Sequence, residues 1–186
     1  SFAVAHNGNI LNARQIRSEL EDSGSIFQTT MDSEVVLHLI ARHYRMGLEQ
    51  AMIQAMMRMR GAYSMVVMTE KGLIAAKDPN GFRPLCLGRL NSGYVVASET
   101  CALDLVEAEF IREIEPGEIV IIDDQGLKTV PSGIPSHKSQ CIFELIYFAR
   151  PDSRVFGKNV YMFRKRQGEM LAREYPIEAD LVMPCL

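Results

Sequence analysis

The sequence contains no tryptophan, no apolar run long enough to span a bilayer, and no charged-then-apolar segment of the secretory type. Neither sign of charge dominates, because 20 Lys and Arg residues stand against 23 Asp and Glu residues and leave a net charge of −3. The sequence therefore has no excess of positive charge of the kind that binds nucleic acid. We expect a soluble protein that binds neither nucleic acid nor membrane.

Cysteine is scarce and scattered. The four cysteines, Cys86, Cys101, Cys141 and Cys185, lie far apart and include no C-x-x-C pair. This spacing excludes a local zinc finger and favours the reduced thiols of a cytosolic protein over a disulfide framework. We therefore expect a cytoplasmic location.

Both ends of the sequence resemble the interior of a longer protein. The chain has no initiator methionine, residues 2–5 already have the pattern of an internal strand, and residues 179–186 resemble a strand with nothing after it. We therefore expect a fragment that is truncated on both sides.

The hydrophobic spacing changes from a helical period to a strand period near residue 60. One helix is expected after Asn12, which forms a capping-box pattern with Gln15, and a second after Asp32 or Ser33, either of which can act as its N-cap. A third helix is expected over residues 48–59, with Gly61 as its C-terminal cap. Short strands are expected at residues 63–68, 73–76, 84–87, 94–97, 118–122 and 127–130.

Helices followed by hairpin-linked strands indicate an α+β domain with a mainly antiparallel sheet. Residues 131–140 are polar and contain proline, as is typical of a boundary between domains. We therefore expect one domain over residues 1–135, and a linker and the truncated beginning of a second domain over residues 136–186. A helix is expected in the second part, from about residue 160 to residue 174.

An amide, a glycine and a carboxylate offer the chemistry of an active site. The tripeptide His6-Asn7-Gly8 follows an apolar strand, and Asp32 precedes a helix. An Asn side-chain amide and a Gly backbone N–H are both hydrogen-bond donors, and a short turn at Asn7-Gly8 would aim both at one oxyanion. Asn-Gly is also the commonest tight-turn dipeptide, so the tripeptide alone does not decide between the two interpretations.

Six further motifs give the tripeptide its weight. Together they closely resemble the glutaminase domain of the amidophosphoribosyltransferases, within the class II N-terminal-nucleophile glutamine amidotransferases, and the resemblance covers essentially the whole chain. In chain order the motifs are Asp32-Ser33-Glu34, Arg60-Gly61-Ala62-Tyr63, Asp78-Pro79-Asn80-Gly81-Phe82-Arg83-Pro84-Leu85, Ala97-Ser98-Glu99-Thr100, Glu115-Pro116-Gly117-Glu118 and Phe148-Ala149-Arg150-Pro151-Asp152-Ser153.

The resemblance implies a partial four-layer αββα fold of the N-terminal-nucleophile hydrolases, followed by the start of an α/β phosphoribosyltransferase domain. It also implies hydrolysis of glutamine by an N-terminal cysteine through a tetrahedral oxyanion and a thioester. By motif match, the side-chain amide of Asn7 and the backbone N–H of Gly8 form the oxyanion hole, and Asp32 holds the α-ammonium of glutamine. The ammonia then displaces pyrophosphate from phosphoribosyl pyrophosphate.

The resemblance further implies a homo-oligomer, a tetramer in the family, and Mg²⁺ bound with phosphoribosyl pyrophosphate at a site outside these 186 residues. The cysteine nucleophile of the family also lies outside them. We therefore expect residues 1–186 alone to release no ammonia from glutamine, and turnover in an ammonia-release assay would refute this expectation.

Cys141 has two interpretations in the light of the resemblance. In one branch of the family a cysteine at this point ligates a [4Fe–4S] cluster with further thiolates from downstream. In other branches a cysteine here holds no cluster. Arg83 either makes a structural ion pair or orders the loop near the site, and we assign it no catalytic role.

Two other kinds of function are open to the sequence. Another class II amidotransferase, of the glucosamine-6-phosphate synthase or asparagine synthetase type, would share the single motifs, but residues 149–153 argue against it. A non-catalytic glutamine-binding regulatory module would share the fold. A cysteine at the mature N-terminus of the natural protein would favour the enzyme.

Overall fold

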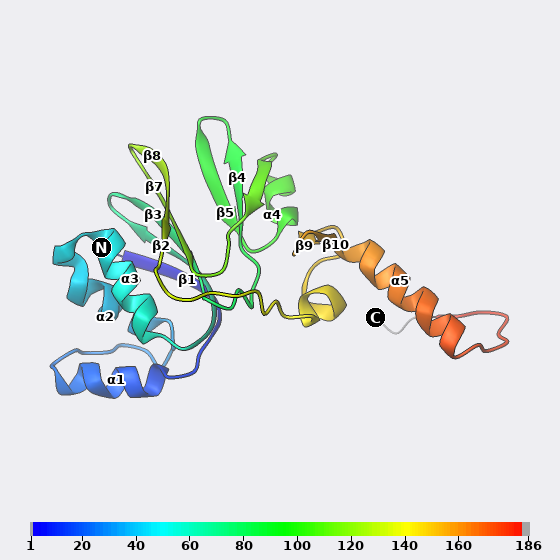
Figure 1. Cartoon of the computed structure of the whole chain (residues 1–186), viewed down its shortest axis with the longest axis horizontal. Helices are drawn as coiled ribbons and strands as arrows, with labels where there is room; N and C mark the ends of the chain where they lie inside the picture. The colour runs from blue at the N-terminus through cyan, green and yellow to red at the C-terminus, as the bar shows by residue number, and fades with distance from the viewer. Residues whose placement is uncertain (1, 184–186) are drawn as a thin grey trace.

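The computed structural model of the chain describes residues 2–183 and arranges most of them in four layers. Helices α1–α3 cover one face of a five-stranded sheet, a three-stranded sheet packs against the other face, and α4 lies on the outside of the smaller sheet (Figure 1). The α+β class and the αββα layering expected from the sequence are both confirmed.

The larger sheet is antiparallel throughout and has the strand order β1-β2-β3-β7-β8. Within the described residues β1 pairs only with β2, so it forms one edge of the sheet. Its strands are β1 (Phe2–Ile10), β2 (Gly61–Thr69), β3 (Gly72–Lys77), β7 (Glu118–Asp123) and β8 (Gly126–Pro131).

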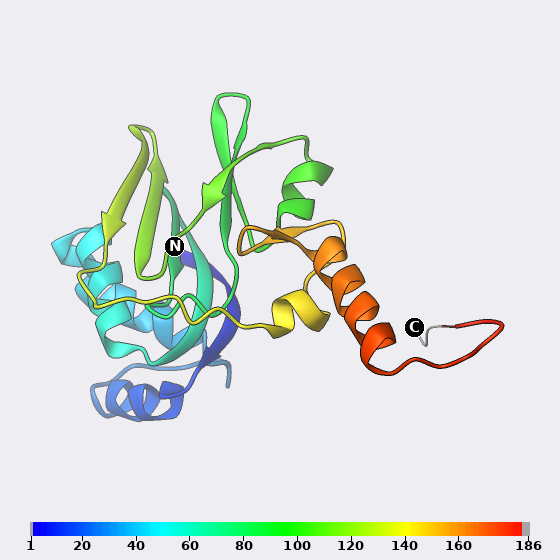
Figure 2. The ribbon, with the colours of Figure 1, turned by 45° about the vertical axis from the view of Figure 1, so that its right-hand side comes forward.

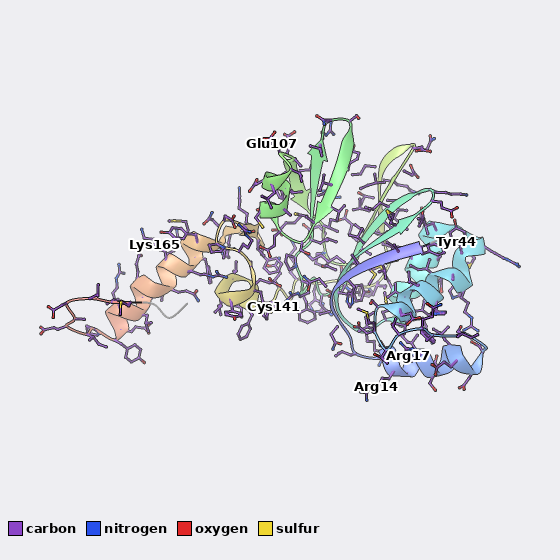
Figure 3. The ribbon with its side chains drawn as sticks, turned by 180° about the vertical axis from the view of Figure 1, so that it is seen from behind. Arg14, Arg17, Tyr44, Glu107, Cys141 and Lys165 are labelled. Carbon is purple, nitrogen blue, oxygen red and sulfur yellow. The ribbon has the colours of Figure 1, made fainter. Side chains whose placement is uncertain are left out.

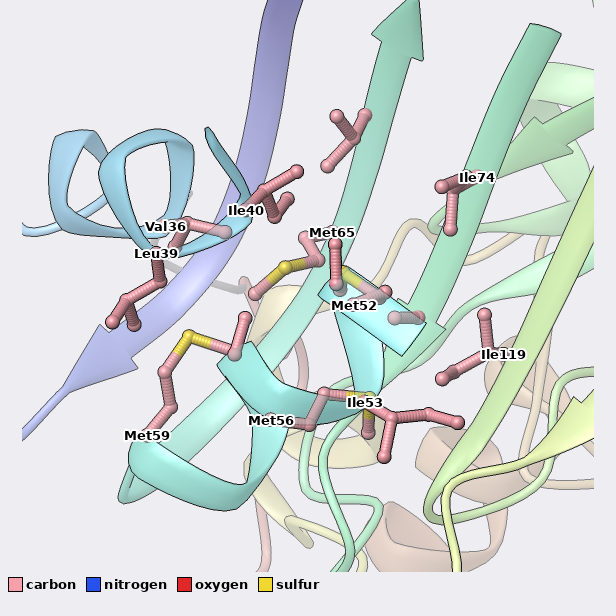
Figure 4. Packing of buried hydrophobic residues seen from close by; sticks show 14 of the residues in the cluster. Val36, Leu39, Ile40, Met52, Ile53, Met56, Met59, Met65, Ile74 and Ile119 are labelled. Atoms are coloured by element: carbon pink, nitrogen blue, oxygen red, sulfur yellow. The ribbon is translucent and has the colours of Figure 1, made fainter. Parts of the chain in front are cut away.

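Alternation along the strands gives the larger sheet two apolar faces. In β2, Tyr63, Met65 and Val67 belong to the cluster under the helices, whereas Val66 packs toward the smaller sheet. Figure 4 shows the helix-facing core, in which methionines of α3 fill the space between α2 and the sheet. The helices are α1 (Ala13–Asp22), α2 (Glu34–His43), the 3₁₀ turn η1 (Tyr44–Met46) and α3 (Leu48–Arg58).

The smaller sheet has the order β5-β4-β6, and α4 packs on it through Leu103. Leu85, Val96 and Ile114 join it to the larger sheet. The sequence did not predict β6 or α4. Their bounds, with those of the other strands, are β4 (Cys86–Leu90), β5 (Gly93–Ala97), α4 (Thr100–Leu105) and β6 (Glu109–Glu113).

The remainder of the chain lies beside the sandwich and includes α5, which projects away from it (Figure 2). The backbone N–H groups of His137, Ser139 and Cys141 donate to carbonyls of residues 79–82, so this stretch is attached to that loop. No helix within residues 2–183 is long and apolar enough to cross a membrane. The elements are the π-helix η2 (Glu144–Phe148), β9 (Arg154–Val155), β10 (Lys158–Asn159) and α5 (Val160–Glu174).

Tertiary contacts overrule three predicted helix caps. Asn12 occupies the N-cap position of α1 but makes no cap hydrogen bond, because its side chain donates to the carbonyl of Arg58 and accepts from the N–H of Arg60. Gly61 does not cap α3 but begins β2, where it pairs with Ile10. Neither side chain of the Asp32–Ser33 pair makes a cap hydrogen bond to α2. Local cap patterns are therefore poor guides where a second segment offers partners.

The predicted ends of some strands also change. The strand expected at residues 84–87 begins at Cys86 and runs to Leu90. Residues 179–183 form no strand, and residues 184–186 of that predicted strand, including Cys185, lie outside the described residues. The helix predicted for residues 160–174 is confirmed as α5.

Candidate functional site

Asn7 and Gly8 lie inside β1, so the turn predicted at this dipeptide is wrong. The strand continues to Ile10, and Asn7 and Gly8 pair with Ser64 and Tyr63 of β2 in an unbroken register. Gly8 has a φ of +142°, and a Cβ atom there would lie 2.0 Å from the carbonyl oxygen of Ala62. Glycine is therefore required for the close approach of two strands and not for a reversal of the chain.

The side chain of Asn7 faces a pocket between the two sheets. The pocket holds about 280 Å³ and is lined by β1, β2 and the end of β5, with Ala5, Ser64 and Ser98 among its residues. The Nε of Arg83 donates to Oδ1 of Asn7 at 3.1 Å. Within the described residues the NH₂ group of Asn7 has no acceptor, and it is free to donate to a bound group.

Asp32 lies where α2 approaches the end of β1. Its Oδ2 accepts a hydrogen bond from the N–H of Ile10 at 2.9 Å, and its Oδ1 lies 3.7 Å from Nδ1 of His6. A pocket of about 240 Å³ opens beside it, with Arg14 and Arg17 on the α1 side (Figure 3). The carboxylate is held from β1 and still reaches a pocket, as an ammonium-binding group requires.

His6 links the two parts of the site. Burial lowers the pKa of the imidazole, and the neighbouring carboxylate of Asp32 opposes this effect. Nε2 of His6 is buried and has no hydrogen-bond partner within the described residues. Among the described residues Asp32 forms no ion pair with a lysine or arginine, so its carboxylate can bind a ligand cation.

Glu34 fixes the loop that carries Asp32. Its carboxylate accepts from the N–H groups of Gln28 and Thr29 and from the hydroxyl of Thr29. These hydrogen bonds lower the pKa of Glu34 from 4.5 to about 2. The loop between α1 and α2 is therefore anchored by an ionised carboxylate.

We expect the Glu34 anchor to be lost in acid. Because the pKa is lower in the folded than in the unfolded chain, the carboxylate stabilises the fold above pH 4.5 and loses its effect as the pH falls toward about 2. Urea unfolding between these pH values should show a smaller acid-dependent loss for Glu34→Gln than for the parent chain. The exposed Glu21→Gln on α1 is the control, and equal slopes for parent and Glu34→Gln would contradict the assignment.

Cys141 is half-buried and lies where the chain leaves the sandwich (Figure 3). Among residues 2–183, no group of three or more His, Cys, Asp or Glu residues is placed to hold a metal ion. Cys86 and Cys101 are buried, and burial raises the pKa of the Cys86 thiol to about 12, which disfavours the thiolate that a cluster needs. Residues 2–183 therefore do not by themselves provide the ligands of an iron–sulfur cluster.

Of the two expectations for Arg83, the structural ion pair is found, and the side chain makes a further contact that was not expected. It pairs with Glu144 and it contacts Asn7. The contact with Asn7 was missed, because the two residues are 76 positions apart and no local pattern links them. The only available signal was the presence of both residues in motifs of one family.

Residues 1–105 match the family described as the glutamine amidotransferase domain. The chain belongs to this family. The chain is 49% identical over 182 residues to the amidophosphoribosyltransferase of Bacillus subtilis (strain 168). It is 51% identical over 184 residues to the chloroplastic amidophosphoribosyltransferase of Vigna aconitifolia, and each alignment covers 98% of this chain.

Solved structures give the same relationship. The chain matches the B. subtilis glutamine phosphoribosylpyrophosphate amidotransferase complexed with ADP and GMP with a TM-score of 0.92 and 49% identity, over 96% of this chain and 39% of that one. A class II glutamine aminotransferase domain protein from Silicibacter pomeroyi shares the fold alone, at 19% identity, a TM-score of 0.55 and coverage of 70% of this chain and 67% of that one. The chain spans 38% of the length of the two curated relatives named above.

Proposed function

We propose that the natural protein carrying this chain hydrolyses glutamine and transfers the ammonia to phosphoribosyl pyrophosphate. The products are 5-phosphoribosylamine, glutamate and pyrophosphate, in the first step of de novo purine biosynthesis. In this proposal Nδ2 of Asn7 and the N–H of Gly8 stabilise the oxyanion, and Asp32 binds the α-ammonium of glutamine. The supporting observation is that Asn7 and Asp32 face two pockets that meet β1 on either side of Gly8.

The direction of backbone groups along β1 supports the role of Gly8. The N–H of Ile10 donates to Asp32 rather than to β2, while the next residue, Leu11, donates to Arg60. Alternate residues of an antiparallel strand turn their N–H groups to the same side, so the N–H of Gly8 is expected at the same free edge as that of Ile10. A carbonyl group bound at this edge would meet two donors, Nδ2 of Asn7 and the backbone N–H of Gly8.

The finer parts of the proposal come from the family resemblance. Residues 1–135 belong to the glutaminase domain, and residues 136–186 are a linker and the beginning of the phosphoribosyltransferase domain. The nucleophile, and Mg²⁺ bound with phosphoribosyl pyrophosphate, act outside residues 1–186 in a cytoplasmic homo-oligomer, a tetramer in the family. A cluster role for Cys141 would require three further thiolates from outside residues 2–183.

The role of Asp32 is tested by removing its charge alone. Asp32→Asn keeps an oxygen that can accept from Ile10, but it loses the attraction for an ammonium group. In the complete natural protein, we expect the KM for glutamine to rise about 10- to 100-fold with little change in kcat, since a charged hydrogen bond that acts equally in ground and transition states is lost. Ammonia-dependent synthesis should not change.

Asp22→Asn is the matched control, because it removes the same charge from the exposed end of α1. An unchanged KM for glutamine in Asp32→Asn would contradict the proposed substrate contact.

A further inference from the structure

We infer that Arg83 is a positioning residue that sets the orientation of the Asn7 carboxamide, and that the π-helix η2 holds Arg83 in place through Glu144 and Phe148. The inference rests on the proposed role of Asn7. It extends the site from the reacting groups to a segment that lies beyond β8 in the chain.

The contact between Arg83 and Asn7 has only one compatible geometry. The guanidinium group carries donors and no acceptor, so Oδ1 and not Nδ2 of Asn7 must face Nε of Arg83, at 3.1 Å. The NH₂ group is therefore turned away from the arginine. An amide rotated by half a turn would present its oxygen to the developing oxyanion and repel it. Arg83 thus selects the productive orientation of Asn7.

Two residues of η2 hold the guanidinium group. Nη1 of Arg83 lies 2.8 Å from Oε1 of Glu144, an ion pair without hydrogen-bond alignment, and the ring of Phe148 lies 5.0 Å from its Cζ. Glu144 is only 1% exposed. Burial raises the pKa of Glu144 and the charge of Arg83 opposes the rise, so the buried carboxylate depends on Arg83.

The backbone of Arg83 is fixed as firmly as its side chain. Its carbonyl accepts from the hydroxyl of Ser64, the residue that pairs with Asn7 in the sheet. The buried carboxylate of Asp78 accepts from the N–H groups of Asn80 and Phe82 and shapes the loop that leads to Arg83. The loop therefore delivers the guanidinium group to Asn7 with little freedom.

The segment that holds Arg83 is itself attached to this loop. The N–H of Cys141 donates to the carbonyl of Phe82, and Glu144 follows one helical turn later. A π-helix is rare and often marks a functional site, because its wider turn is less stable than an α-helical one. A shift of η2 that withdraws Glu144 would release Arg83 and leave Asn7 free to rotate. Glutamine hydrolysis is thereby coupled to the conformation of η2.

The test uses the complete natural protein with three variants. Arg83→Gln removes the charge that pairs with Glu144 and the Nε donor that contacts Asn7. Arg83→Lys keeps a charge for Glu144 but lacks the planar guanidinium group that also reaches Asn7. Glu144→Gln removes the ion pair from the other side. We expect glutamine-dependent kcat to fall about 10- to 100-fold in both Arg83 variants, because a misplaced Asn7 carboxamide stabilises the oxyanion poorly. The fall in Glu144→Gln should be smaller. The KM for glutamine and the ammonia-dependent rate should not change.

Arg112→Gln is the matched control, since Arg112 also pairs with a buried glutamate, Glu118, away from Asn7. The decisive measurement is Arg83→Lys in an Asn7→Ala background, where we expect no further loss of kcat. A full additional loss there, or a kcat equal to that of the control in Arg83→Lys alone, would overturn the inference. If Asn7→Ala itself left glutamine hydrolysis intact, the proposed role of Asn7 would fail instead, whereas a parent protein that released no ammonia from glutamine would refute the proposed function.

Discussion

Replacing Asn7 with alanine should lower glutamine-dependent kcat about 10²- to 10³-fold in the complete natural protein, the usual effect of removing one oxyanion-hole donor. The loss follows because Asn7 lines the pocket and its NH₂ group, the proposed donor, is removed. Ammonia-dependent synthesis of 5-phosphoribosylamine should continue at the parent rate, since ammonia bypasses the oxyanion. Comparing the two rates in one preparation separates this effect from unfolding.

Asn7→Asp sharpens the prediction. The carboxylate has nearly the same shape and can accept from Arg83, but it has no donor and its charge opposes an oxyanion. It should be at least as inactive with glutamine as Asn7→Ala. Asn91→Gly, which changes an asparagine of positive φ in the β4–β5 turn, should keep both rates. Glutamine turnover by Asn7→Asp at the parent rate would refute the donor role.

Replacing Gly8 with alanine should destabilise the fold by about 3 kcal/mol or more, through backbone strain and overpacking together. The new Cβ would lie 2.0 Å from the carbonyl oxygen of Ala62 and 2.9 Å from Cα of Tyr63, so β1 and β2 would have to separate. The free energy of unfolding in urea measures the effect. A thermal midpoint about 10 °C lower is the corresponding shift for a chain of this size.

Gly24→Ala controls for backbone strain without a clash. Gly24 also has a positive φ, +92°, but a Cβ there meets nothing within 4 Å. Its cost should be about 1 kcal/mol. Equal destabilisation by the two substitutions would show that the close approach at Gly8 carries no energy of its own.

The parts of the fold that the sequence predicted are those with a strong hydrophobic period. Helix α3 and strands β2, β3, β7 and β8 bury one or both faces, so their side chains repeat at the helical or strand spacing. Strand β6 was missed because Glu109–Ile111 are exposed and leave no apolar alternation. Helix α4 was missed because six residues are too few to establish a period.

The site residues remain a prediction, but the local structure expected at two of them was wrong. Asn7-Gly8 has the composition of a turn, but nine paired positions between β1 and β2 outweigh that preference. The contacts that orient the site, from Arg83 to Asn7 and from Ile10 to Asp32, join segments 76 and 22 positions apart. Such contacts depend on the packed fold, and no local sequence pattern contains them.

A crystal structure of the complete natural protein after reaction with a diazoketone analogue of glutamine would test the central claim most directly. The keto oxygen of the adduct stands where the oxyanion forms. We predict that it lies about 3 Å from both Nδ2 of Asn7 and the backbone nitrogen of Gly8, with the α-ammonium group of the adduct beside Asp32. A keto oxygen directed away from β1, or an ammonium group in contact with other carboxylates, would contradict the assignment of this site.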